Sequence, residues 1–170
     1  DPPLLETTLR ESFASGDVVF SFGGIGATPD DVTRQCAAAA AGVLLVRHAE
    51  AVALIEARFG ESAYPNRVLM ADLPQGARLI PNPVNQIPGF SLHQHHFLPG
   101  FPNMAWPMAE WVLDTQYRHL FRAQPESERA VMVYDVAESA LIPIMRELLV
   151  AFPGIKLASL PSTTNGGEIE

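Results

Sequence analysis

Apolar residues follow two kinds of pattern along this chain, one helical and one strand-like. Leu5, Leu9 and Phe13 recur every four residues, which predicts an amphipathic helix that ends at Gly16. Short apolar runs bounded by glycine, proline or polar residues predict strands. The same patterns predict further helices over residues 29–41, 49–59, 103–121 and 135–152, and strands over residues 17–22, 77–80, 90–98, 130–134 and 155–160.

The order of these elements indicates the fold class. Strands that alternate with helices predict an α/β sandwich with a mostly parallel sheet, in which ligands bind beyond the carboxyl ends of the strands. The pattern contains no internal repeat and no clear domain boundary. We therefore expect a single domain over residues 1–170, long enough to bury one core.

A glycine-rich segment joins the first predicted strand to the helix that follows it. Its glycines are Gly23, Gly24 and Gly26. Glycine permits positive φ and close approach of a ligand to the backbone. Thr28 fits the N-cap of the helix, Pro29 fits its first position, and Asp31 stands three after the cap as in a capping box. The free N–H groups of such a helix start favour an anion, so this segment predicts a phosphate site.

Two adjacent carboxylates, Asp30 and Asp31, stand in the first turn of this predicted helix. One reading gives both acids a purely structural role at the positive end of the helix dipole. However, a single acid completes a capping box, and a second one beside a phosphate weakens binding unless it holds a metal ion or a proton. We therefore favour a catalytic or metal-binding role, with Asp31 ahead of Asp30.

Composition excludes several functional classes. The formal net charge of -8 argues against a broad basic surface for nucleic acid, and Lys156 is the only lysine. Attraction for a nucleotide would thus come from backbone N–H groups, a few arginines and a divalent cation. No apolar run approaches the ~20 residues of a bilayer crossing, and Cys36 is the only cysteine. We expect a cytoplasmic protein without a membrane partner, with Cys36 as a small buried thiol.

Other candidate site residues have simpler explanations. His93 and His95 are two apart, so on one strand they could share a metal ion, but a pair lacks the third ligand of a recognisable zinc site. We expect these histidines and His96 to lie on a solvent-facing strand edge. Arg34 could reach a phosphate, although pairing with Asp30 one turn earlier is the preferred interpretation.

Four blocks of sequence resemble one family in the same order. The first runs from Gly23 to Thr33, the second from Met70 to Ala77, the third from Pro81 to Phe90, and the fourth from Leu98 to Met104. Together they resemble the molybdopterin-binding, MoaB/Mog-like domain superfamily, in the form found at the N-terminus of CinA proteins. The resemblance implies a three-layer α/β/α sandwich and a bacterial source.

The resemblance also implies which residues form the site. The turn at Pro99 and Gly100 would be the other wall of the pocket, and Asn82 and Asn85 would line a third loop, although Asn85 stands where CinA-type sequences often have glycine. The implied nucleotide- or pterin-phosphate contacts are Gly23, Gly24, Gly26, Thr28, Thr33, Asn82, Pro99 and Gly100. Asp31 would bind a divalent ion (Mg²⁺, Mn²⁺ or Co²⁺) or orient the attacking group, with Asp30 supporting it.

Family members transfer an adenylyl group to molybdopterin or hydrolyse nucleotide pyrophosphates such as ADP-ribose or FAD. The CinA form of the blocks favours metal-dependent pyrophosphate hydrolysis, with adenylyl transfer and a noncatalytic binding module as the alternatives. The family normally begins with a further strand-helix unit, so we expect a chain truncated at both ends. Relatives commonly associate, so we also expect a dimer or trimer.

Overall fold

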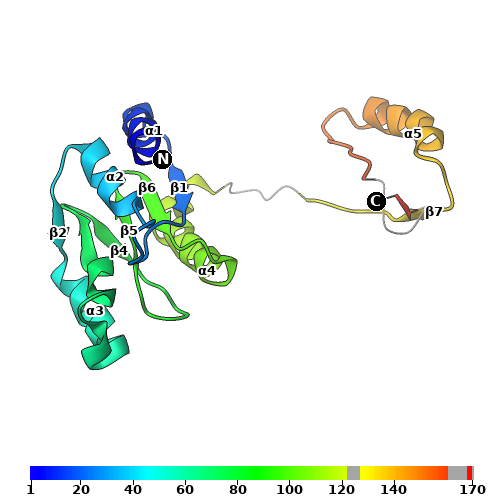
Figure 1. The fold of residues 1–170 in the computed structure, drawn as a ribbon. Helices are drawn as coiled ribbons and strands as arrows, with labels where there is room; N and C mark the ends of the chain where they lie inside the picture. The colour runs from blue at the N-terminus through cyan, green and yellow to red at the C-terminus, as the bar shows by residue number, and fades with distance from the viewer. Residues whose placement is uncertain (122–126, 161–167, 170) are drawn as a thin grey trace. The chain divides into compact units, whose positions relative to one another are not determined.

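The computed structural model describes residues 1–121, 127–160 and 168–169. The chain forms two compact units, one over residues 1–121 and the other over residues 122–170 (Figure 1). Each unit is described by itself below. That both belong to a single domain stays a prediction.

A four-stranded mixed sheet forms the centre of the first unit. The strands are β1 (Val19–Phe22), β6 (His95–Leu98), β5 (Gly89–Leu92) and β4 (Arg78–Ile80), in that order across the sheet. β1 is parallel to β6, whereas β5 is antiparallel to both β6 and β4. Strands β1, β6 and β4 therefore point the same way, and their carboxyl ends meet at one edge.

The mixed sheet corrects the prediction of one strand over residues 90–98. The chain reverses at His93 and Gln94, so that the segment forms the antiparallel hairpin of β5 and β6. His93 adopts a φ of 53°, in the left-handed region that a tight reversal requires. The sequence pattern contained no sign of this reversal, because the turn residues His93 and Gln94 are not glycine, asparagine or proline.

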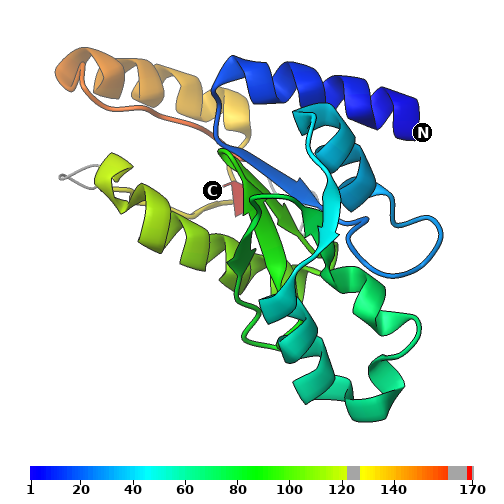
Figure 2. The same ribbon diagram turned by 90° about the vertical axis from the view of Figure 1, so that its left-hand side faces the viewer.

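Helices cover both faces of this sheet, which confirms the α/β fold, but the described sheet is mixed and not mostly parallel as predicted (Figure 2). Helices α1 (Pro2–Ser15) and α2 (Thr33–Ala41) lie over one face, and α4 (Pro102–Val112) lies over the other. The first core cluster joins α1 and α2 to the sheet, and the second joins α4 to it. Leu9, Cys36, Phe90 and Phe97 belong to the first cluster, and Ile80, Leu98, Met108 and Val112 to the second.

A second pair of strands extends the unit beside α2. Strands β2 (Leu45–Arg47) and β3 (Asp72–Pro74) are antiparallel, and α2 packs on β3. Between them in sequence come helix α3 (Ala49–Phe59) and the short 3-10 helices η1 (Gly60–Ala63) and η2 (Arg67–Ala71). This arrangement places β3 and η2 next to the start of α2, where the glycine-rich segment ends.

Two helices differ in extent from the predicted ones. Helix α2 begins at Thr33 and not at Pro29, because residues 28–31 form a separate turn. Helix α4 begins at Pro102, close to its predicted start, but ends at Val112 and not at residue 121, and Pro107 lies inside it. After α4 the chain continues as a π-helical turn, η3 (Leu113–Tyr117), and a 3-10 turn, η4 (Arg118–Leu120).

The described residues of the second unit form one helix and one short strand pair. Helix α5 (Glu138–Ala151) follows β7 (Val133–Tyr134), which pairs antiparallel with β8 (Glu168–Ile169). The strand predicted over residues 130–134 is thus reduced to two residues, and residues 155–160 do not form the predicted strand. No helix in the described parts of either unit has the length and hydropathy needed to cross a bilayer.

Two histidines expected on a solvent-facing edge are instead buried on opposite faces of β6. His95 Nε2 lies 2.7 Å from the Ser12 hydroxyl of α1. His96 Nδ1 lies 2.8 Å from the Ser91 hydroxyl, and its Nε2 lies 2.8 Å from the Tyr117 hydroxyl. Each ring therefore ties the sheet to a flanking segment. Among the described residues, no cluster of three metal-ligating side chains includes them.

Burial makes His96 a source of acid sensitivity. Burial, together with the charge of Arg78, lowers the pKa of His96 to about 4, from an ordinary value of 6.5. The unfolded chain therefore binds a proton at His96 before the folded chain does, and stability decreases as the pH falls from 6.5 towards 4. We expect a loss of up to about 3 kcal/mol over this window.

Urea unfolding at several pH values tests this expectation. His96→Gln should flatten the decrease between pH 6.5 and 4, because glutamine does not titrate. The control is His93→Asn, since His93 is exposed and asparagine tolerates positive φ. An unchanged slope in His96→Gln, or an equal change in His93→Asn, would contradict the assignment.

Candidate functional site

Three loops meet at the edge of the sheet where β1, β6 and β4 end. They are the glycine loop (residues 23–32) after β1, the Pro99–Gly100 turn after β6, and residues 81–88 after β4. A Cβ added to Gly100 would lie 3.4 Å from the Gly23 Cα, so the first two loops are in contact through their glycines. The glycine loop and the Pro99–Gly100 turn are thus in contact, and that they form two walls of one ligand pocket stays a prediction.

Thr33 fixes the glycine loop to the start of α2. Its N–H donates to the Gly24 carbonyl at 3.0 Å, and its hydroxyl donates to the Gly23 carbonyl at 3.2 Å. Gly24 has a φ of +70°, and a Cβ there would lie 2.2 Å from the Thr33 Oγ1. Thr33 is buried and holds the loop in place. Thr33 could bind a phosphate, as predicted, only if its N–H or hydroxyl donated to the phosphate as well as to these loop carbonyls.

Thr28 and Asp31 form a turn in the loop instead of capping the helix. The Asp31 N–H donates to the Thr28 carbonyl at 2.9 Å. In return, the Asp31 Oδ2 accepts from the Thr28 N–H at 2.9 Å and from the Thr28 hydroxyl at 2.5 Å. The reciprocal pair resembles a capping box, but it closes a turn two residues before the helix. Asp30 lies exposed in this turn and takes part in none of these bonds.

Asp31 is held in its charged form. Burial raises its pKa, but hydrogen bonds from the side chain and backbone of Thr28 and the backbone of Gly26, with the charge of Arg34, outweigh burial and lower the pKa below 3.8. A Cβ on Gly26 would lie 2.4 Å from the Asp31 Oδ2, so the carboxylate rests against the loop backbone. At neutral pH the side chain can accept a hydrogen bond or bind a cation, but it cannot donate a proton.

Several amides expected to bind an anion are used within the protein. The Gly23 N–H donates to the Leu98 carbonyl at 2.8 Å, and those of Thr28, Asp31 and Thr33 are bonded within the loop. No hydrogen bond between described residues uses the amides of Gly24, Ile25 and Ala27. The expected anion site at the helix start is therefore smaller than predicted. Its remaining donors lie in the middle of the loop.

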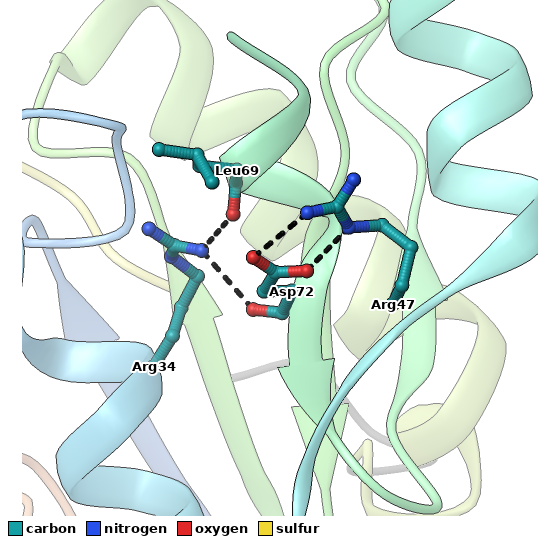
Figure 3. A network of polar contacts seen from close by, with 4 residues as sticks. All are labelled: Arg34, Arg47, Leu69 and Asp72. Carbon is teal, nitrogen blue, oxygen red and sulfur yellow. Dashed lines mark hydrogen bonds and ion pairs between the residues drawn. The ribbon is translucent and has the colours of Figure 1, made fainter. Parts of the chain in front are cut away.

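Arg34 connects the glycine loop to η2 and β3. The residue is 3% exposed, and its guanidinium donates to the Gly26 carbonyl at 2.6 Å, to the Asp72 carbonyl at 3.1 Å and to the Leu69 carbonyl. Figure 3 shows the bonds to Leu69 and Asp72. Burial lowers the pKa of Arg34, while the carboxylates of Asp72 and Asp31 act in the opposite direction. The expected pairing with Asp30 is wrong, because the side chain points inward.

Asp72 completes this network through its side chain. Its carboxylate forms an ion pair with Arg47 of β2, whose NH2 group lies 3.2 Å from the Asp72 Oδ2 (Figure 3). Sequence reasoning missed both arginines as structural anchors. The sequence did contain one signal for Arg34. The small residues that follow it on α2 predict a helix packed closely on its neighbours, so a side chain on that face points toward the interior.

A pocket of about 290 Å³ opens beside this network. Its lining contains charged, polar and apolar side chains from the glycine loop, α2, β2, η2 and β3. They are Ala27, Thr28, Pro29, Asp31, Arg34, Gln35, Leu45, Leu69 and Asp72. The pocket thus adjoins the ionised Asp31, and its lining begins at Ala27, one of the residues with an unused amide.

A divalent cation at this pocket would be held by the Asp31 carboxylate and shared with a ligand. Both hydrogen bonds from Thr28 reach the Oδ2 of Asp31, so Oδ1 is the oxygen best placed to bind a cation. The Asp72 carboxylate is occupied by Arg47. Mg²⁺ is commonly held by one or two carboxylates, with the remaining ligands from substrate phosphates and water. Within the described residues, no group of three acidic, histidine or cysteine side chains could hold an ion alone.

The third loop is stabilised by Asn82. The buried Asn82 Oδ1 accepts from the Val84 N–H at 3.0 Å, and its Nδ2 lies 3.6 Å from the Met104 Sδ of α4. Asn85 also contacts Met104, at 3.2 Å. These side chains shape the loop and tie it to α4. A direct contact of Asn82 with a ligand stays a prediction.

Comparison with known proteins identifies the family. A family model described as a probable molybdopterin binding domain matches residues 1–119. The chain belongs to this family. The glycine loop, the Pro99–Gly100 turn and residues 81–88 all lie within the matched segment. The predicted resemblance is therefore confirmed.

Similar proteins occur in archaea and bacteria. A protein from Pyrobaculum calidifontis is 34% identical over 159 residues, covering 89% of this chain and 61% of that protein. A CinA-like protein from Syntrophotalea carbinolica is 36% identical over 142 residues, covering 79% of this chain and 34% of that protein. Because archaeal proteins are among the relatives, the inference of a bacterial source is not supported.

A solved structure supports the same assignment. The crystal structure of the protein CinA with unknown function from Thermoplasma acidophilum is similar, with a TM-score of 0.60 and 30% identity. The match covers 67% of this chain and 71% of that chain. The domain is thus of the MoaB/Mog-like, CinA type. The chain spans 61% of the length of the Pyrobaculum relative and 34% of the CinA-like one.

The contact between Gly24 and Thr33 leads to a stability prediction. Gly24→Ala should cost roughly 1–2 kcal/mol for the left-handed backbone and a further amount for the clash with Thr33. The control is Gly42→Ala, because Gly42 has a φ of +67° but no atom within 4 Å of an added Cβ. Thermal unfolding should show a larger decrease in Tm for Gly24→Ala. Equal decreases would show that the clash is absent.

Proposed function

We propose that this domain binds a nucleotide or pterin phosphate at the glycine loop and hydrolyses a pyrophosphate bond in that ligand. The observation that carries the proposal is the ionised Asp31 carboxylate beside the unused amides of Gly24, Ile25 and Ala27. Backbone N–H groups are suited to phosphate oxygens, and the pocket beside Asp31 leaves room for a phosphate group.

Charge balance supports a divalent cation in this reaction. A phosphate next to the Asp31 carboxylate would place two anions together, and the Arg34 guanidinium beneath them is already bonded to three carbonyls. When bound, Mg²⁺, Mn²⁺ or Co²⁺ would offset negative charge on the phosphate oxygens and on the group that leaves. Asp31 would hold this ion through Oδ1, while Thr28 keeps the carboxylate oriented through Oδ2.

The proposed reaction is attack of water on the α-phosphorus of a ligand such as ADP-ribose or FAD. A new P–O bond to water forms as the bridging P–O bond breaks, and the products are AMP and a second phosphate monoester. The water loses its protons to solvent, and the bridging oxygen leaves on the second product. The loop amides would stabilise charge that develops on the nonbridging oxygens.

Adenylyl transfer to molybdopterin is the second candidate function. The observation that favours it is the family description, which names molybdopterin as the ligand of the domain. The same amides and the same carboxylate would serve, with an acceptor phosphate in place of water. The third alternative is a noncatalytic binding module, in which the loop amides would bind the phosphate without any reaction. In each case we infer a cytoplasmic protein that assembles as a dimer or trimer, without nucleic-acid or membrane partners.

Replacing the two adjacent aspartates one at a time tests the proposal. Asp31→Asn should lower the rate of AMP release from ADP-ribose by on the order of a hundredfold or more, because it removes the charge that holds the cation. Asp30→Asn is the matched control, and its rate should stay within a few-fold of the unchanged chain. Chromatography of AMP with Mg²⁺, Mn²⁺ or Co²⁺ measures both rates. An equal loss in Asp30→Asn would show that Asp30 has the supporting role the sequence suggested.

Two further measurements make the outcome decisive. Thermal unfolding of Asp31→Asn separates lost chemistry from a disrupted turn, and Thr28→Val removes the hydroxyl bond to Asp31 while keeping the charge. Binding of ADP-ribose, FAD and ATP without turnover with any of the three metals would overturn hydrolysis in favour of a binding module. Consumption of ATP only when molybdopterin is present would instead identify the transferase.

A further inference from the structure

A second pocket lies at the opposite end of the glycine loop from Asp31. It has a volume of about 260 Å³ and is lined by Phe22, Gly100, Pro102, Ala105 and Trp106. Phe22 ends β1 and directly precedes Gly23, so this pocket is continuous in sequence with the loop. The first pocket begins at Ala27. In the sequence, the loop residues with unused amides therefore lie between Phe22 of this pocket and Thr28 of the first.

The two aromatic side chains of this pocket are unusually exposed. Trp106 is 72% exposed and Phe22 is 55% exposed. Exposed apolar patches on soluble proteins commonly mark binding sites, and tryptophan is among the residues most enriched at them. No charged side chain lines the pocket, in contrast to the pocket at Asp31. The two pockets thus suit two chemically different parts of one ligand.

Two of the other residues that line this pocket are small. Gly100 carries no side chain, and Ala105 of α4 carries only a methyl group. The Gly100 backbone is also fixed by its contact with Gly23. An aromatic slot with small residues at its base fits a flat ring, which stacks on aromatic faces at offset or edge-on geometry.

We propose that Phe22 and Trp106 bind the planar heterocycle of the ligand, a purine or a pterin, while the glycine loop binds its phosphates. This inference rests on the proposed function and adds the orientation of the ligand along the glycine loop. The ring lies at the Phe22 end of the loop, and the phosphate bond that is cleaved lies at the Thr28–Asp31 end. Trp106 and Phe22 are then specificity-determining residues, since they select ligands that carry a ring.

Replacing Trp106 tests the direction of binding. Trp106→Ala should weaken binding of AMP and of neopterin monophosphate by between about fivefold and a hundredfold, the usual range for loss of one stacked aromatic. Binding of inorganic pyrophosphate should change less than twofold, because it has no ring. Trp106→Phe should restore most of the affinity. The ligand that the unchanged chain binds more tightly, AMP or neopterin monophosphate, shows whether the ring is a purine or a pterin.

Trp111→Phe is the matched control for this experiment. The chain contains two tryptophans, and Trp111 also lies on α4 but lines neither pocket. Trp111→Phe should leave all affinities unchanged and makes Trp106 the only tryptophan. Quenching of its fluorescence by AMP or neopterin monophosphate, but not by pyrophosphate, would support the proposal directly.

Three results would overturn the inference. Equal weakening of pyrophosphate and ring-bearing ligands by Trp106→Ala would show that Trp106 supports the loop and does not bind a ring. A change of oligomeric state in Trp106→Ala, with ring binding unaffected, would assign the patch to contact between copies of the chain. If the unchanged chain binds pyrophosphate but binds AMP and neopterin monophosphate no more tightly, the ring site fails while the phosphate site stands. Failure to bind any of the three would remove the proposed function itself.

Discussion

The buried guanidinium of Arg34 is the interaction on which the site depends. A buried charge costs several kcal/mol unless it is well bonded. Here the guanidinium donates to carbonyls of three separate segments, the glycine loop at Gly26, η2 at Leu69 and β3 at Asp72. No common sheet joins these three segments to one another. One side chain on α2 therefore fixes how the loop, the second strand pair and the helix lie together.

This anchoring explains how a glycine-rich segment keeps a defined shape. Glycines lose more conformational entropy on folding than other residues, so a loop with three of them needs external contacts. Arg34 holds the carbonyl of Gly26, Thr33 holds those of Gly23 and Gly24, and Gly23 bonds to the end of β6. The carbonyls of the three glycines and the amide of Gly23 are therefore all hydrogen-bonded within the protein. The central amides have no partner among the described residues, at the edge where three strands point the same way.

The sequence predicted the parts of this arrangement that depend on local patterns. The glycine loop, the burial of Cys36 and the approximate positions of the helices of the first unit follow from spacing, turn residues and the family blocks. The hairpin at His93 did not, because its turn lacks the Asn-Gly or Gly-Gly signal. The buried positions of His95 and His96 were missed for the same reason, since they follow from the hairpin.

The start of α2 was misplaced for a different physical reason. A threonine followed three residues later by an aspartate satisfies both a helix cap and an isolated turn, and the local bonds between them are the same. The choice between these structures is made by distant contacts, namely the bonds of Thr33 to the loop and of Arg34 to η2 and β3. Sequence patterns carry no information about such contacts. Arg34 could therefore be recognised as a basic residue near the site, but not as its anchor.

The position of Asp31 shows how one carboxylate can serve both the fold and the proposed chemistry. One oxygen accepts two hydrogen bonds from Thr28, and the side chain rests against Gly26, so the loop already encloses a negative charge of its own. A phosphate on the neighbouring amides would be repelled by that charge in the absence of a cation. With a cation between them, the same fixed charge becomes a reason for the phosphate to bind in one orientation. Under the proposed function, the carboxylate that closes the turn would also be the feature that makes ligand binding depend on a metal.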